Sequence, residues 1–140
     1  MDEGDLIVFY GGLRPIHACE HKLIYALMGM YVVDEVVPAA SVPPHRWHEN
    51  AHVRKAKRGE ADIVVRAKAD LSGRFDRCIA IGEWRSGAYR VRKDVLDAWG
   101  GLSVKDGFIQ RSAVPPSLNE PAQFLDWMQK QPIQAIARNN

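Results

Sequence analysis

Apolar, β-prone runs separated by short polar breaks dominate the first third of the chain. Residues 6–10 form the first run and predict a buried strand that Gly11-Gly12 ends. Residues 22–37 are mostly apolar and carry Gly29 inside the run. They predict a long bent strand, because an internal glycine often marks a bulge or a bend. A helix over residues 22–30 stays open as the alternative.

Shorter elements are predicted for the rest of the chain. Strands are expected at residues 62–68, 78–84, 88–92 and 108–110, with a loop at 38–47, a hairpin connection at 70–76 and a turn at 85–87. Helices are expected at 51–58 after an Asn50 cap, at 94–99 with Asp94 as the cap, and at 120–129 with Asn119 as the cap. Short strands joined by short helices favour a small β-barrel or an α+β sheet over a doubly wound fold, whose crossover helices are longer.

Length and composition are those of one ordinary globular domain spanning residues 1–140. The chain has 140 residues, of which 46% are hydrophobic. No run approaches the roughly 18 uncharged apolar residues of a membrane span, and the acidic N-terminus is unlike a signal peptide. Two cysteines, Cys19 and Cys78, make no disulfide framework. We therefore expect a cytoplasmic protein with no membrane association.

Positive charge is concentrated in the middle of the chain. Residues 44–93 hold 13 of the 19 Lys and Arg residues but only 6 of the 17 Asp and Glu residues. This imbalance predicts one basic face, and basic faces often contact nucleic acid. A solvated surface whose counter-charges fold close by explains the same pattern, and the two interpretations stay open.

Known catalytic and metal-binding signatures are missing. His45, His48 and His52 are closely spaced but match no standard zinc spacing, so a metal or catalytic role for them is only the alternative. Cys19 stands between His17 and His21, yet neighbours in sequence need not face one another. The sequence therefore indicates no cofactor and favours binding over catalysis, while an enzymatic role stays open.

Aromatic residues are interleaved with the basic ones. Trp47, Trp84 and Tyr89 stand among arginines and lysines, including Arg54, Lys55, Lys57, Arg58, Arg90 and Arg92. Cationic groups contact phosphates and exposed aromatic rings stack on unpaired bases, so the pattern indicates nucleic-acid binding. For Trp84 and Tyr89 taken singly, core packing is the favoured interpretation and base stacking the alternative, whereas Trp47 is expected to be partly exposed.

Three blocks in order resemble a known family. They are residues 5–14 (DLIVFYGGLR), 27–37 (LMGMYVVDEVV) and 47–52 (WHENAH). The pattern resembles the nucleotide-modification-associated domain proteins, most closely their third type, which are linked to systems that modify DNA bases. The first two blocks also resemble strands of EVE and PUA-like barrels, which hold a modified or flipped base in a pocket. The resemblance implies a small mixed or antiparallel PUA-like barrel of the α+β class with a few short helices.

The resemblance also implies roles for individual residues. Side chains at the first strand end and on the loop near residue 50 would surround a base pocket, and a second group would extend the phosphate-contacting surface. The first group is Phe9, Tyr10, Arg14, Trp47, His48, Asn50, His52 and Arg54; the second is Tyr89, Arg90, Arg92, Gln110 and Arg111.

The sequence thus predicts a module that binds nucleic acid or a nucleotide, with DNA as the favoured partner, around a modified or flipped base. The alternatives are an enzyme of DNA or nucleotide modification that uses His45, His48 and His52, and an interaction module of a modification complex. Relatives carry a further segment before the first strand, so we expect either a fragment or a sheet that closes differently. An unpaired edge at residues 6–10 would then favour a homodimer.

Overall fold

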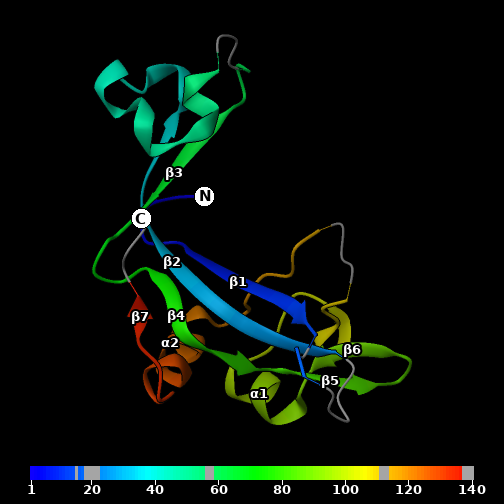
Figure 1. The fold of residues 1–140 in the computed structure, drawn as a ribbon. Coiled ribbons are helices and arrows are strands. Elements are labelled where there is room, and N and C mark those ends of the chain that lie inside the picture. Colours follow the sequence, from blue (N-terminus) through cyan, green and yellow to red (C-terminus); the bar gives the residue numbers. More distant parts are fainter. Residues whose placement is uncertain (15, 18–22, 56–58, 111–113, 137–140) are drawn as a thin grey trace.

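An open, mostly antiparallel sheet forms the centre of the protein (Figure 1). The computed structural model describes residues 1–14, 16–17, 23–55, 59–110 and 114–136. Strands β1 (Leu6–Leu13), β2 (Ile24–Pro38), β4 (Gly73–Ala80) and β7 (Ala135–Ile136) pair in the order β1-β2-β4-β7, and β3 (Ile63–Ala67) also pairs with β2. The α+β class is therefore confirmed. Among the described residues, no helix is long and apolar enough to cross a membrane.

The sheet does not close into a barrel. Its strand path ends at β1 on one side and at β7 on the other, so the predicted PUA-like closure is not confirmed. The sheet stays open because two short helices, and not further strands, pack on the face of the sheet that carries the hydrophobic core. β1 is an edge strand among the described residues, and pairing of a second copy with it stays a prediction.

The long apolar run is one 15-residue strand, β2, and the helical alternative for its first half is wrong. Its first half pairs with β1 and β4, and its second half pairs with β3. Gly29 lies where the registers of both neighbours shift. A Cβ atom on this glycine would lie only 2.7 Å from the carbonyl oxygen of Gly73, so the close approach of β4 requires glycine there.

The hairpin predicted at residues 70–76 is wrong. β3 and β4 both run antiparallel to β2, so the chain continues along β2 instead of reversing between them. The buried Ser72 fills the gap in the ladder: its Oγ accepts a hydrogen bond from the Val32 backbone N–H at 2.9 Å. A side-chain hydroxyl thus replaces a missing main-chain partner.

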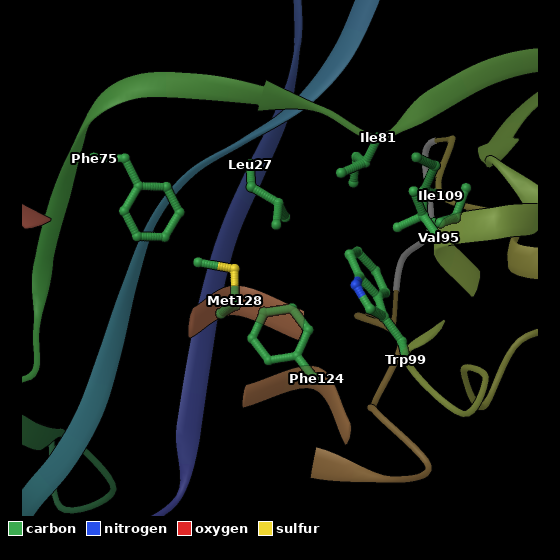
Figure 2. Packing of buried hydrophobic residues seen from close by; sticks show 9 residues of the cluster. Leu27, Phe75, Ile81, Val95, Trp99, Ile109, Phe124 and Met128 are labelled. Carbon is green, nitrogen blue, oxygen red and sulfur yellow. The ribbon is translucent and has the colours of Figure 1, made fainter. Parts of the chain in front are cut away.

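Two short helices, α1 (Lys93–Ala98) and α2 (Pro121–Gln129), supply much of the main core. Figure 2 shows Leu27 and Phe75 of the sheet opposite Trp99, Phe124 and Met128. The Trp99 and Phe124 rings meet edge to face, with centroids 5.2 Å apart. The residues before the helices, Arg92 and Glu120, are the N-caps and make no side-chain cap hydrogen bond. The predicted Asp94 and Asn119 caps are therefore wrong.

A hairpin of β5 (Gly82–Arg85) and β6 (Ala88–Val91) follows β4. The strand predicted at 78–84 is thus divided between β4 and β5, at Ile81. The predicted turn is confirmed: Ser86 and Gly87 both have positive φ, 51° and 76°, as a tight hairpin turn requires. The strand predicted at 108–110 is reduced to one bridge between Arg90 and Phe108, after the short 3-10 turn η4 (Lys105–Gly107).

A second, smaller core lies in what we call the arm, the outer half of β2 with β3 and the 3-10 turns between them (Figure 1). These turns are η1 (Ala39–Ser41), η2 (Pro44–Glu49) and η3 (Ala51–Arg54). The arm core consists of four buried residues, Ala39, Val42, Val53 and Val64. The helix predicted at 51–58 is a 3-10 turn, and residues 56–58 lie outside the described part. The Asn50 cap is confirmed, since its Oδ1 accepts from the His52 N–H at 2.8 Å.

Ion pairs fasten η2 to the strands of the arm. Glu49 accepts from Arg46 Nε at 2.6 Å and from Arg66 Nε at 2.9 Å, and Glu35 contacts both arginines. The hydrogen bond from Arg46, with help from Arg66, lowers the pKa of Glu49 below its usual value of 4.5. The folded arm therefore prefers the ionised carboxylate.

Acidification should loosen the arm through Glu49. A carboxyl whose pKa is lower in the folded than in the unfolded state stabilises the fold above its unfolded pKa of about 4.5, and loses this effect as pH falls through the folded value. We expect Glu49→Gln to weaken the packing of η2 on the arm slightly at pH 7, because an exposed ion pair contributes little, and to flatten this acid dependence. The indole N–H resonance of Trp47 reports the change. Glu60→Gln, at an exposed carboxylate, is the control, and equal acid profiles for Glu49→Gln and the unaltered protein would contradict the assignment.

Candidate functional site

Three aromatic side chains from distant parts of the chain form what we call the aromatic surface. Tyr89 lies between Tyr25 and Trp84, with ring centroids at 5.0 Å and 5.1 Å. Trp84 is 62% exposed, which is unusual for so large an apolar side chain. Core packing is therefore wrong for Trp84, while Tyr89 is half-buried.

The hairpin register creates this surface. Trp84 is paired directly with Tyr89, so both side chains leave the hairpin on one face. Gly82 makes room for the third ring, because a Cβ atom there would lie 2.5 Å from the Cβ of Tyr25. The Gln110 Oε1 accepts a hydrogen bond from the Tyr89 backbone N–H at 2.9 Å. The predicted residues Tyr89 and Gln110 are thus brought together by the structure.

The opposite face of the hairpin carries an ionic network. Arg85 donates to Asp106 at 2.6 Å and to Glu83 at 2.8 Å, and the Arg90 guanidinium also pairs with Asp106. The hydrogen bond from Arg85 lowers the pKa of Asp106 below its usual value. Arg90 further lies over the Phe108 ring at 5.6 Å. The network holds the hairpin against residues 105–108. It therefore also fixes the position of the aromatic surface on the other face of the hairpin.

A pocket of about 510 Å³ lies between β1, α2 and the loop that includes residues 115–118. Its walls are mainly apolar and include Leu6, Val8, Leu27, Trp99, Ile109 and Phe124. Tyr10 also lines it and donates from its hydroxyl to the Ile109 carbonyl at 3.4 Å. Burial, followed by the nearby Tyr25, raises the pKa of Tyr10 above 10.0. At neutral pH Tyr10 is therefore an uncharged phenol in the pocket wall.

The other predicted residues near β1 lie away from this pocket. Phe9 and Tyr10 leave the strand on opposite faces, and Phe9 packs edge to face on Tyr31, with centroids 4.8 Å apart. Arg14 is exposed just beyond the strand end. Strand alternation therefore separates two residues that the resemblance places at one pocket mouth.

The predicted residues of the arm have local roles in the structure. Trp47 is half-buried, as expected, and packs on the arm core, where its Nε1 donates to the Val42 carbonyl at 2.9 Å. The His48 ring bonds the carbonyl of His45 at 3.0 Å, and Asn50 caps η3. These residues belong to the arm, at the opposite end of β2 from the hairpin (Figure 1). The structure thus does not join them with Tyr89 and Gln110.

Histidine side chains on the arm do not assemble a metal centre. His52 is exposed and lies 3.4 Å from the Lys55 Nζ through its Nδ1, and Arg54 is also exposed. Within the described ranges, no group of three or more His, Cys, Asp or Glu side chains is placed to hold a metal ion. Cys19, His21 and Arg111 lie outside those ranges, so the structure leaves them undescribed.

Many cations of the basic segment have partners inside the protein. Of its eleven Lys and Arg residues that the structure describes, seven pair with described carboxylates: Arg46, Arg66, Lys68, Arg77, Arg85, Arg90 and Arg92. Counter-charges folded close by therefore explain much of the imbalance. Phosphate contact by Arg90 and Arg92 stays a prediction.

The sequence places Trp84 in the pattern of interleaved basic and aromatic residues, but the predicted site residues include neither Trp84, nor Trp99, nor the loop at residues 115–118. For Trp84 a signal exists, since a tight turn at Ser86-Gly87 pairs it with Tyr89 across the hairpin. For the pocket no local signal exists, because its walls come from segments as distant as β1 and α2.

Comparison with known families gives a match over most of the chain. The sequence profile of nucleotide modification associated domain 3 matches residues 1–109. Comparison with curated proteins and with solved structures finds no match. The matched range contains β1 to β6, α1 and the whole aromatic surface. The chain therefore belongs to the nucleotide modification associated domain 3 family.

Proposed function

We propose that this protein binds nucleic acid, with DNA as the favoured partner, by stacking an unpaired or flipped base on the aromatic surface. The observation that carries the proposal is the 62% exposure of Trp84 beside Tyr89 and Tyr25. Family membership supports it through the association with nucleotide modification. In this proposal the chain recognises a base and performs no chemistry on it.

Stacking fits the geometry of the aromatic surface. An exposed indole next to a phenol ring offers a flat, sequence-tolerant contact to any base, worth about 1–3 kcal/mol per base. Ion pairs of Arg85 and Arg90 with Asp106 hold the opposite face of the hairpin. The loss of conformational entropy of the hairpin on binding should therefore be small. Exposed cations nearby in sequence, such as Lys93, would add salt-dependent phosphate contacts.

Removal of the exposed indole tests the proposal. Trp84→Ala should weaken binding of a fluorescent single-stranded oligonucleotide by about 5- to 150-fold, the equivalent of one lost stacking contact. The measurement is fluorescence anisotropy at two salt concentrations, with single-stranded, duplex and base-modified oligonucleotides. A preference for one modified base would name the ligand.

Phe9→Ala is the matched control, because Phe9 is an exposed aromatic residue outside the aromatic surface. It should leave the affinity unchanged. The proposal fails if the unaltered protein binds no oligonucleotide at about 50 mM salt, where phosphate contacts are least screened. It also fails if the two variants weaken binding equally. The alternative enzymatic role of His45, His48 and His52 is favoured by no arrangement among the residues that the structure describes.

A further inference from the structure

The outer edge of β1 is open. β1 pairs with β2 on one side, and its backbone forms no hydrogen bond with any other described segment of the chain. Proteins usually protect such an edge with charged side chains, proline or a covering element, because its unpaired N–H and C=O groups accept another strand. The eight residues of β1, LIVFYGGL, include no charge and no proline. This edge is therefore able to pair with a further strand.

A groove follows the open edge. The pocket of about 510 Å³ is lined by Leu6, Ile7 and Val8, three consecutive residues of β1. Side chains alternate between the two faces of a strand, so a hollow on the core face alone would contact Leu6 and Val8 but not Ile7. Because Ile7 also lines it, the hollow extends along the edge of the strand, where the backbone of each residue is accessible.

The far wall of the groove does not supply the missing strand. This wall is the loop at residues 115–118, and its Pro115 and Pro116 have no backbone N–H to donate. Another part of the loop is engaged elsewhere, since the Ser103 N–H donates to the Ser117 carbonyl at 2.9 Å. The proline rings form an apolar wall beside the open edge. An open strand edge next to an apolar groove is the arrangement that receives an extended chain as an added strand.

The charges at the two ends of β1 indicate which chain this is. Asp5 precedes the strand and Arg14 follows it, and both side chains are exposed. In an antiparallel pair of two β1 strands, the Asp5 end of each copy lies beside the Arg14 end of the other, so opposite charges meet at both ends. A parallel pair would bring Asp5 beside Asp5. The segment is thus complementary to an antiparallel copy of itself.

We propose that β1 pairs antiparallel with β1 of a second copy, which joins the two sheets into one across a two-fold axis. The middle of residues 5–14 falls between Phe9 and Tyr10, so matched ends place Phe9 close to this axis. The same register places Gly11-Gly12 of each copy along the groove of the other, where a strand without side chains is able to approach the loop wall. Both copies use the same surface, so the assembly stops at a dimer. Because this interface is small, we expect a Kd in the micromolar range.

Exchange of the end charges tests this arrangement without altering the strand. Arg14→Glu places like charges at both ends and should raise the dimer Kd by about 2- to 10-fold. Asp5→Lys combined with Arg14→Glu restores opposite charges and should return the Kd to that of the unaltered protein. Restoration requires that each copy meets another copy, because the strand of a different partner would keep its own charges. Sedimentation velocity over a series of protein concentrations at low salt measures the Kd.

A charge in the middle of the strand is the second test. Phe9→Lys places two like charges near the two-fold axis and should raise the Kd by at least about 10-fold. Leu71→Lys is the matched control, because Leu71 is an exposed apolar residue in a turn outside the sheet, and it should leave the Kd unchanged. Far-ultraviolet circular dichroism checks the fold of each variant. If Phe9→Lys does not fold, the end-charge variants decide the question, because their changes lie outside β1.

Three results would overturn the proposal. They are a protein that stays monomeric at every concentration, equal effects of Phe9→Lys and Leu71→Lys, and a double charge exchange that does not restore the dimer. The first and third would leave the edge to the strand of a different partner. Each copy carries its own aromatic surface, so loss of the dimer and loss of oligonucleotide binding through Trp84 are separate outcomes.

Discussion

Phe124→Ala should lower the free energy of unfolding by about 3–5 kcal/mol, the range found when a fully buried phenylalanine is truncated. Phe124 is 0% exposed and meets both Trp99 and Trp127 in aromatic contacts. Its removal leaves a void where α2 faces the sheet, and the rigid neighbouring rings can fill it only in part. Urea denaturation followed by far-ultraviolet circular dichroism measures the change.

Asp126→Ala is the matched control for this variant. It lies on the exposed side of the same helix and should change the stability by no more than about 0.5 kcal/mol. If Phe124→Ala also stays within that range, α2 does not close the core as described. A large effect from both variants would instead point to the stability of α2 itself, independent of its packing.

Gly29→Ala should lower the free energy of unfolding by about 3 kcal/mol, the upper end of the usual range for overpacking. The added methyl group would lie 2.7 Å from the carbonyl oxygen of Gly73 and 3.2 Å from the Cα of Arg74. Both atoms belong to the backbone of the neighbouring strand, which cannot move aside without breaking its pairing with β2. Urea denaturation gives the magnitude, and hydrogen exchange of the β4 amides locates the damage.

Gly11→Ala, on the strand at the other side of β2, serves as the comparison. There the nearest atom to an added methyl group is the flexible Met28 Cε, at 3.2 Å. We expect a loss of stability well below that of Gly29→Ala, because a methionine side chain can change rotamer. Equal losses of stability for the two variants would mean that the close approach of β2 and β4 at Gly29 is not what makes Gly29→Ala destabilising.

Local sequence signals predicted much of the fold correctly. Apolar β-branched runs located β1, β2 and β3, and a single glycine within the second run indicated where its registers shift. The turn at Ser86-Gly87 followed from residues that favour positive φ. These features depend on interactions between residues a few positions apart, so the local sequence is enough to predict them.

Features decided by distant partners were predicted wrongly or not at all. Ser72-Gly73 has the composition of a hairpin turn, yet β2 offers both flanking strands the same edge and the chain runs on without reversing. The candidate site shows the same limit. Its loop residue Trp47 packs on the arm. The aromatic surface, in contrast, needs the ring of Tyr25, which is far from Tyr89 and Trp84 in the chain.

The position of α2 also determines which fragments can be expressed usefully. The family match ends at residue 109, whereas α2 covers Pro121–Gln129 and places Phe124 and Met128 in the core. A fragment cut at the family boundary would leave Trp99, Leu27 and Ile81 facing water. Such a surface favours aggregation. Crystallisation or ligand screening with this protein therefore requires a fragment that extends beyond α2, even though the family boundary suggests a shorter one.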